Sequence, residues 1–219
     1  MLSLLVKFAQ LRSHLEELQN GNLYCREIKY FKELEDDSIR GDPFEAVIKL
    51  GILGPNSEFL IRPKDQPDQP WKKLNIIKGR YQAALPNPLG NLFCMSLIPV
   101  EFNEDPTLFK FDEEFEKFGN YFLLVYNQKE FWKRLKKGLR KNKIKGVGKI
   151  VDYVDFSTYS GKKTLFQKDA SYAWQKEIRL YLDTEADRPF LFSIGDISDI
   201  SMIYDLNQYK GFVIKKGPL

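Results

Sequence analysis

The chain has 219 residues, a length that allows one large domain or one domain with a small appendage. Its composition is 43% hydrophobic, 14% aromatic and 29% charged, which excludes a disordered chain, a collagen, a coiled coil and a disulfide scaffold. The net charge of +4 conceals a basic segment, because residues 129–149 hold ten Lys or Arg against one acid, Glu130. That segment carries +9 and the other 198 residues carry −5, so any attraction for nucleic acid is local.

The few cysteines and the single histidine restrict the chemistry. Cys25 and Cys94 have no further thiol near them in sequence, which favours a reducing, cytoplasmic setting. With His14 as the sole histidine, the usual zinc ligand sets cannot be assembled, so no zinc is expected and only Mg²⁺ or Ca²⁺ held by carboxylates stays open. The N-terminal run contains Lys7 and lacks a cleavage site, and no stretch approaches the roughly 20 apolar residues of a membrane span, so we expect no membrane association.

The first 45 residues predict a strand, a short helix and an acidic loop. Alternating apolar residues at 4–8 indicate a strand. Ser13 and Glu16 form a capping-box pattern at the start of a helix, and Gly21 provides its left-handed end. Residues 35–45 hold five acids around a Gly and a Pro, which forces a loop.

The middle of the chain alternates strand patterns with breakers. A strand is expected at 46–52, and four prolines make 54–70 an extended, proline-rich loop around a short strand at 59–61. The continuous apolar runs 92–97 and 121–126 predict central strands with both faces covered. Between these two runs, residues 113–118 predict a short helix.

The basic segment predicts a helix over residues 129–145. Asn127, with Glu130 three residues later, provides its cap. The apolar stripe of Phe131, Leu135 and Leu139 predicts a buried face, with most of the basic residues on the other side.

Short extended segments fill the rest of the chain. Gly146 and Gly148 end the basic region, residues 150–154 and 165–166 read as extended, and residues 172–175 read as one helical turn. Further strands are expected around 178–182, 190–194 and 212–214. About nine strands and three or four short helices predict one α+β domain over 1–219, dominated by sheet.

Three clusters of residues are candidates for chemistry. The first is the acidic loop, where Arg40 is an anion binder beside Asp42 and Glu45, which could coordinate Mg²⁺ or orient a ribose hydroxyl; the alternative is a solvated turn. The second lies at 166–181, where strand alternation places Glu177, Arg179 and Tyr181 on one face, which either faces water or lines a cleft.

The third cluster is the basic helix. An excess of positive charge would attract phosphates with a strong dependence on salt. The alternatives are a solubilising surface and a docking site for a partner protein. The residues expected to contact nucleic acid are Lys133, Lys136, Lys137, Arg140 and Lys141.

Several blocks along the chain resemble a widespread family of uncharacterised bacterial and phage proteins. The resemblance covers most of the chain and includes the sequences GNLY at 21–24, YF at 30–31, RGDPFE at 40–45, FCM at 93–95 and, near the end, Phe166-x-Lys168 followed by Tyr172-x-x-Gln175-x-Glu177-x-Arg179. No activity of that family is carried over to this chain.

The order of these blocks also has a remote resemblance to ADP-ribosyltransferase-type folds, with Lys7 in place of the usual Arg or His. The resemblance implies NAD-dependent transfer to a protein or nucleic acid in conflict between bacteria and phages. It implies that Glu177 stabilises the oxocarbenium ion and that Gln175 positions the acceptor. The implied NAD-binding residues are Lys7, Tyr30, Phe31, Arg40 and Tyr172. The alternative is a non-catalytic module that binds nucleic acid or a protein through the basic helix.

Overall fold

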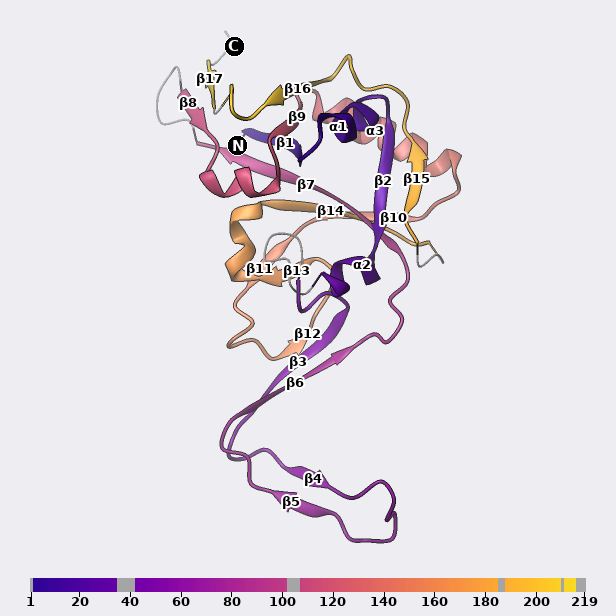
Figure 1. Ribbon diagram of the computed structural model, residues 1–219, viewed down its shortest axis with the longest axis vertical. Coiled ribbons are helices and arrows are strands. Elements are labelled where there is room, and N and C mark those ends of the chain that lie inside the picture. Colours follow the sequence, from indigo (N-terminus) through magenta and orange to yellow (C-terminus); the bar gives the residue numbers. More distant parts are fainter. Residues whose placement is uncertain (1, 35–41, 102–106, 185–187, 210, 216–219) are drawn as a thin grey trace.

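An antiparallel sheet of eight strands forms the centre of the protein in its computed structural model (Figure 1). The structure describes residues 2–34, 42–101, 107–184, 188–209 and 211–215. The order across the sheet is β10 (Gly146–Ile150), β14 (Glu177–Leu182), β7 (Asn91–Val100), β1 (Leu2–Ala9), β9 (Tyr121–Val125) and β16 (Ser201–Asp205). The other two strands are β2 (Asn22–Glu27), which pairs with β7, and β15 (Phe190–Ser193), which pairs with β2.

Smaller sheets and five short helices complete the described part of the chain. A three-stranded sheet is formed by β3 (Val47–Leu53), β6 (Gly79–Ala84) and β12 (Gly161–Lys162). The two-stranded pairs are β4 (Phe59–Ile61) with β5 (Lys72–Leu74), β8 (Thr107–Lys110) with β17 (Gly211–Ile214), and β11 (Asp152–Val154) with β13 (Gln167–Asp169). The helices are α1 (Arg12–Gln19), α2 (Ile28–Glu33), α3 (Gln128–Lys141) and the 3₁₀ helices η1 (Glu113–Phe118) and η2 (Ala170–Gln175). The sheet-dominated α+β class is therefore confirmed.

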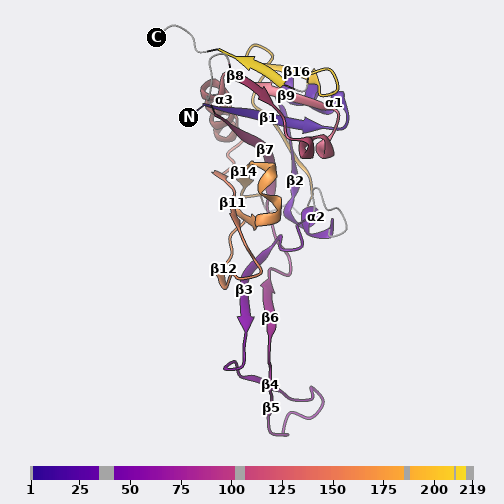
Figure 2. The ribbon, with the colours of Figure 1, turned by 90° about the vertical axis from the view of Figure 1, so that its left-hand side faces the viewer.

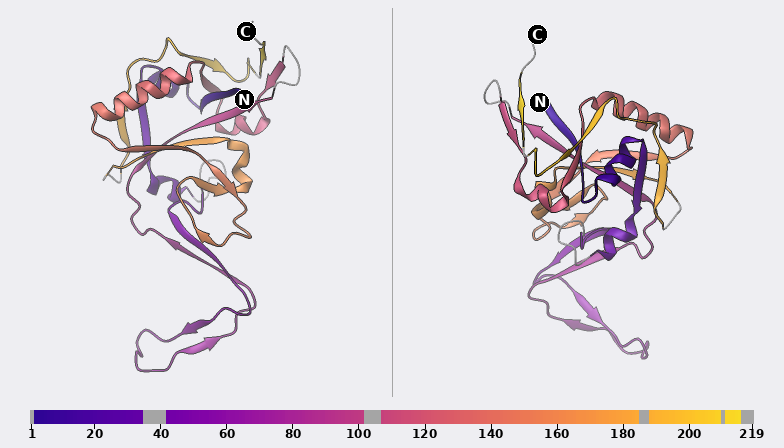
Figure 3. Two further views of the ribbon diagram at one scale, coloured as in Figure 1. Left: turned by 180° about the vertical axis from the view of Figure 1, so that it is seen from behind. Right: turned by 45° about the horizontal axis from the view of Figure 1, so that its top comes forward.

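Both faces of the central sheet are covered. On one face, α1 and α3 pack with β2 and β15, and Phe131 and Leu135 of α3 join Leu15 of α1 in the main core (Figure 3). On the other face, Phe115 of η1 packs against Phe8 of β1, with ring centroids 5.0 Å apart. This arrangement makes β7 and β9 interior strands, as their continuous apolar sequences predict.

Helix α3 keeps its predicted cap and buried stripe but is shorter than expected. The Asn127 side chain accepts a hydrogen bond from the Glu130 N–H at 3.1 Å, and Phe131, Leu135 and Leu139 are buried. The helix ends at Lys141, so residues 142–145 link it to β10. Gly146 and Gly148 were expected to end the basic region before a strand at 150, but both lie inside β10, whose backbone pairs with β14.

Two other local predictions are wrong. Helix α1 starts after Leu11, which makes no side-chain cap, so Ser13 lies within the first turn and Glu16 pairs with Arg12 at 3.0 Å instead of closing a capping box. Residues 165–166 form a turn, and the strand β13 starts only at Gln167. The left-handed end at Gly21 is confirmed by its φ of +91°.

A two-stranded ribbon projects from the body (Figures 1 and 2). Its stem is β3 with β6, and its outer part is β4 with β5, which includes the strand expected at 59–61 within the proline-rich segment. The stem is anchored where Val47 and Leu50 pack against Phe156. Within the described residues, no helix has the length and apolar content to cross a membrane.

Candidate functional site

Four of the residues that the sequence analysis selected at 166–181 lie in a buried group of charged and polar side chains, whereas Tyr172 and Tyr181 are only half-buried. We call this group the charge cluster; its members are Asp42, Glu45, Lys163, Lys168, Gln175, Glu177 and Arg179. Asp42 and Glu45 lie in the turn before β3, and Lys163 directly follows β12. Lys168 lies on β13, Gln175 on η2, and Glu177 and Arg179 on β14. All seven side chains are at least nine-tenths buried. The alternative of a solvated turn is therefore wrong for Asp42 and Glu45, and the alternative of a solvated strand face is wrong for Glu177 and Arg179.

Arg179 lies at the centre of the charge cluster and links two carboxylates. Its Nε donates to Glu177 Oε1 at 2.7 Å, and Nη1 and Nη2 each lie 3.1 Å from a Glu45 carboxylate oxygen. Nη1 also donates to the Leu165 carbonyl at 2.6 Å. Burial would lower the pKa of Arg179, but the two carboxylates outweigh it and raise the pKa well above its usual value.

Glu177 is held by two cations. Besides Arg179, Lys168 Nζ lies 3.0 Å from Glu177 Oε2 and donates to Gln175 Oε1 at 2.7 Å. The Glu177 N–H donates to the Tyr153 hydroxyl at 2.8 Å. Burial would raise the pKa of Glu177, but Arg179 and Lys168 outweigh it and hold the pKa well below the usual range. Glu177 is therefore an ionised carboxylate inside the fold.

Asp42 and Lys163 are less well paired than the rest of the cluster. Asp42 Oδ1 accepts the Phe44 N–H at 2.9 Å, while Asp42 Oδ2 and Lys163 Nζ have no hydrogen-bond partner among the described residues. Burial, with Glu45 adding to it, raises the pKa of Asp42. Burial also lowers the pKa of Lys163, although Glu45 and Asp42 favour its charged form.

The structure brings some of the proposed NAD-binding residues to the charge cluster and separates others. Lys168 Nζ lies 5.1 Å from the centre of the Tyr172 ring, so Tyr172 adjoins Gln175 and Glu177. Phe31 packs in an apolar group with Cys94 and Leu165, which border the cluster. Tyr30 instead lies under the Arg26 guanidinium, at 4.0 Å.

Lys7 lies on the other side of the central sheet. In the strand register, Val6 pairs with Ser96 and Glu177 also pairs with Ser96, so Glu177 shares a face with Val6 and not with Lys7. Lys7 Nζ donates to the Cys94 carbonyl at 2.6 Å and lies over the Phe93 ring on the face of the main core. Arg40, another of the implied NAD-binding residues, falls outside the described residues.

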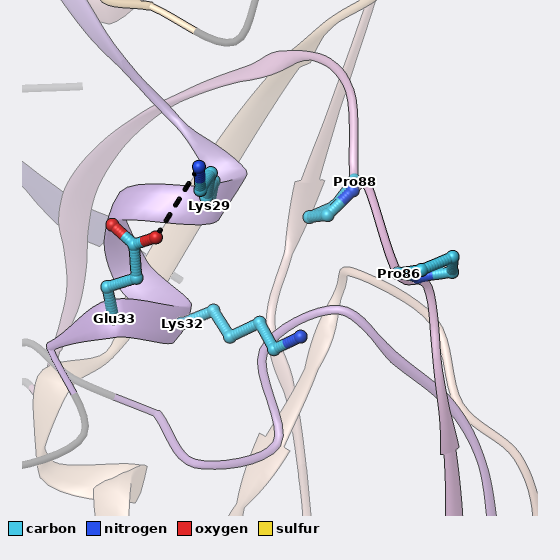
Figure 4. Close-up of a pocket in the computed structure, with 5 residues that line it drawn as sticks. All are labelled: Lys29, Lys32, Glu33, Pro86 and Pro88. Atoms are coloured by element: carbon cyan, nitrogen blue, oxygen red, sulfur yellow. Dashed lines mark ion pairs between the residues drawn. The ribbon is translucent and has the colours of Figure 1, made fainter.

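Two surface hollows among the described residues contain no member of the charge cluster. One hollow of about 390 Å³ is lined by Lys29, Lys32, Glu33, Pro86 and Pro88, with Lys29 and Glu33 paired at 3.7 Å (Figure 4). A second lies beside η1 and contains no cluster residue. In the described part of the chain, no three His, Cys, Asp or Glu side chains are placed to hold a metal ion.

The basic face of α3 is the second candidate site. Lys133, Lys136, Lys137, Arg140 and Lys141 are all exposed and recur at the three- and four-residue spacing that defines one helix face. Arg134 is different, because its guanidinium makes two 2.6 Å contacts with the Asp199 carboxylate and also meets Glu130. Lys133 shares Glu130 with it at 3.1 Å.

Sequence reasoning missed Lys163, a member of the charge cluster, and Tyr153, whose hydroxyl accepts the Glu177 N–H. Lys163 follows a two-residue strand and carries no pattern, and Tyr153 looks like an ordinary strand aromatic. Both enter the site only because β11, β12 and β13 fold back beside β14.

Comparisons of the chain with family models, with curated proteins and with solved structures give no match. The class that the fold and its sites define is a sheet-dominated α+β domain with an internal charge cluster and an exposed basic helix.

Proposed function

We propose that the protein binds nucleic acid through the basic face of α3 and the chain that follows it into β10. The observation that carries the proposal is an excess of unneutralised positive charge. Eight basic residues of the segment 129–149 are exposed and have no carboxylate partner within 4 Å among the described residues. They are Lys129, Lys136, Lys137, Arg140, Lys141, Lys143, Lys145 and Lys149.

The packing of α3 fixes the direction of this charge. Because Phe131, Leu135, Gly138 and Leu139 are buried, the opposite face of the helix has to point outward. From Lys133 to Lys141 the helix rises about 12 Å, at roughly 1.5 Å per residue. A duplex carries about seven phosphate charges over that length of its axis. The stripe therefore matches several consecutive phosphates.

The internal ion pairs separate structural from binding residues in the same helix. Arg134 fixes the loop that holds Asp196 and Asp199, donating to the Asp196 carbonyl at 2.6 Å. The side chains of Lys136, Lys137 and Arg140 make no ion pair with a described carboxylate. They can therefore bind phosphates without breaking a contact that stabilises the fold.

The test is the dependence of affinity on salt. Duplex and single-stranded DNA and RNA are titrated against wild type and against a triple variant, Lys136→Glu, Lys137→Glu and Arg140→Glu, at two or more salt concentrations. We expect weaker binding and a slope of log affinity against log salt reduced by about 2 to 3. The control reverses Lys32, Lys110 and Lys162, on α2, β8 and β12, with the same change in net charge. Equal losses in both variants, or no micromolar binding by wild type at low salt, would overturn the proposal.

The charge cluster supports a second candidate, NAD-dependent ADP-ribosyl transfer. The observation in its favour is that Lys168 brings Tyr172, Gln175 and Glu177 together. It takes second place because Glu177 is only 6% exposed and already faces two cations. Calorimetric titration with NAD is the test: binding that Glu177→Gln weakens is expected, and no binding at millimolar NAD would remove this candidate.

A further inference from the structure

Two side chains of the charge cluster, Asp42 and Lys163, each keep a polar atom that no described residue satisfies. Asp42 Oδ2 accepts no hydrogen bond and Lys163 Nζ donates none, although both atoms are shielded from the surrounding solvent. No described carboxylate lies within 4 Å of Lys163 Nζ, so the lysine has no ion pair either. Buried polar atoms in folded proteins almost always have a partner, from the protein or from ordered water, because a buried charge without one is strongly unfavourable. These two atoms therefore point to a bound ligand.

The two side chains meet at the base of the projecting ribbon. Asp42 Oδ1 accepts the Phe44 N–H at 2.9 Å, and the Phe44 ring packs against the Phe156 ring with centroids 5.0 Å apart. Lys163 Nζ lies 5.7 Å from the centre of the same Phe156 ring, and the Lys163 N–H donates to the Ile48 carbonyl at 2.9 Å. The turn before β3 and the chain after β12 are therefore in direct contact around one aromatic pair.

Glu45 adds a second acceptor to this place. Its Oε2 lies 3.1 Å from Arg179 Nη2, but the direction of that contact leaves Oε2 without a hydrogen bond. Glu45 and Asp42 both oppose the effect of burial on the pKa of Lys163, which agrees with two carboxylates close to its ammonium group. The site thus combines one group that donates hydrogen bonds with two oxygens that accept them.

The charges and the burial of the cluster restrict what the ligand is. The cluster has three carboxylates and three cations, so a bound ion would leave an uncompensated charge inside the protein. All seven side chains are at least nine-tenths buried, and neither surface hollow includes a member of the cluster, so the ligand has to be small. A small neutral molecule that both accepts and donates hydrogen bonds is water, and a buried water typically makes about three of them.

We propose that one internal water molecule bridges Lys163 to Asp42 and Glu45. It accepts a hydrogen bond from Lys163 Nζ and donates one to Asp42 Oδ2 and one to Glu45 Oε2. The water thereby joins the turn before β3 to the chain after β12, and it exchanges with the solvent only when the base of the ribbon opens. This site is independent of nucleic-acid binding at α3.

The first test is a crystal structure of the wild-type protein at about 1.5 Å resolution, where ordered water is located directly. We expect a single peak of electron density at about 2.7 to 3.2 Å from Lys163 Nζ, Asp42 Oδ2 and Glu45 Oε2. A direct ion pair between Lys163 and either carboxylate, a metal ion on the carboxylates, or side chains that pack together with no peak would overturn the proposal.

The second test counts buried water in solution. Oxygen-17 relaxation dispersion detects water molecules that stay inside a protein for longer than its tumbling time. We expect the double variant Asp42→Leu, Lys163→Met, in which apolar side chains replace both groups, to hold one such water fewer than wild type. Equal numbers in wild type and the folded double variant would contradict the proposal.

The control for this count is Ser201→Ala. It removes another buried polar group, whose hydroxyl already donates to the Ile197 carbonyl at 2.7 Å, so the number of long-lived waters should stay at the wild-type value. Thermal unfolding shows whether each variant is folded, and the wild-type crystal structure decides the question if the double variant is not.

Discussion

Arg179 on β14 and Glu45 in the turn before β3 form a buried two-point ion pair across 134 residues of sequence. Both guanidinium Nη atoms lie 3.1 Å from a carboxylate oxygen, and both side chains are almost completely shielded from water. Because Arg179 also binds Glu177, one guanidinium compensates two buried negative charges. The pair joins the base of the projecting ribbon to the central sheet.

Replacing Arg179 should destabilise the fold strongly. In Arg179→Met, two carboxylates lose their main counter-ion in a region where water cannot replace it, a loss of about 3 to 5 kcal/mol. Urea unfolding followed by circular dichroism measures the effect. Arg134→Met removes a 2.6 Å pair with Asp199, whose carboxylate is 58% exposed, and should cost far less, because water screens that pair. Similar losses in the two variants would contradict the structural role of the buried pair.

Acid should expose opposite contributions from two carboxylates of the charge cluster. The pKa of Glu177 is lowered in the folded state, so its stabilisation is present above its unfolded pKa of about 4.3 and is lost as the pH falls below it. Glu177→Gln should therefore be less stable than wild type at pH 7. Between pH 5 and pH 3 its free energy of unfolding should fall by less than that of wild type, because it has no carboxylate to protonate at this position. Stability measured by denaturant unfolding across this range tests the prediction.

Asp42 provides the matched comparison, because its pKa is raised in the folded state. The folded protein takes up that proton before the unfolded chain does, so Asp42 lowers stability at neutral pH and opposes the acid loss. Asp42→Asn, which retains an oxygen for the Phe44 N–H, should be more stable at pH 7 and lose more stability on acidification. If both variants shift the acid dependence in the same direction, the assignment of the two carboxylates is wrong.

Gly21 should be far less replaceable than its neighbour Gly195. Both have positive φ, at +91° and +83°. A Cβ on Gly21 would lie 2.1 Å from the Gly195 carbonyl oxygen, whereas a Cβ on Gly195 would meet nothing within 4 Å. Gly195→Ala should cost roughly 1 kcal/mol of backbone strain, and Gly21→Ala several times more, because the backbone has to move. Thermal unfolding of the two variants decides whether this close approach exists.

The two predicted helix caps should respond differently to alanine. Asn127→Ala removes the side-chain acceptor for the Glu130 N–H and should cost about 1 kcal/mol. Ser13→Ala should change stability very little, because Ser13 lies inside α1 and makes no cap. Chemical denaturation of both variants measures the difference in the free energy of unfolding. Equal losses would mean that Ser13 does cap α1, which would contradict a helix start after Leu11.

Local patterns in the sequence were sufficient for the elements whose burial depends on neighbours in the chain. The continuous apolar runs at 92–97 and 121–126 correctly predicted interior strands, and Asn127 with the stripe of Phe131, Leu135 and Leu139 correctly predicted a capped, one-sided helix. The sequence also showed the concentration of basic charge on that helix. Such features depend on spacings of two to four residues, which the chain itself sets.

Only the tertiary structure decided where the charged residues of 42–45 and 163–179 lie. An alternating strand such as 177–182 has the same pattern whether its polar face meets water or another layer of the protein, and β3, β12 and β13 supply that layer here. Ion pairs such as Arg179 with Glu45 join residues 134 positions apart, and no local spacing encodes them. The sequence by itself therefore determined the core strands and the basic helix, whereas the fold alone converted a polar strand face into a buried charge cluster.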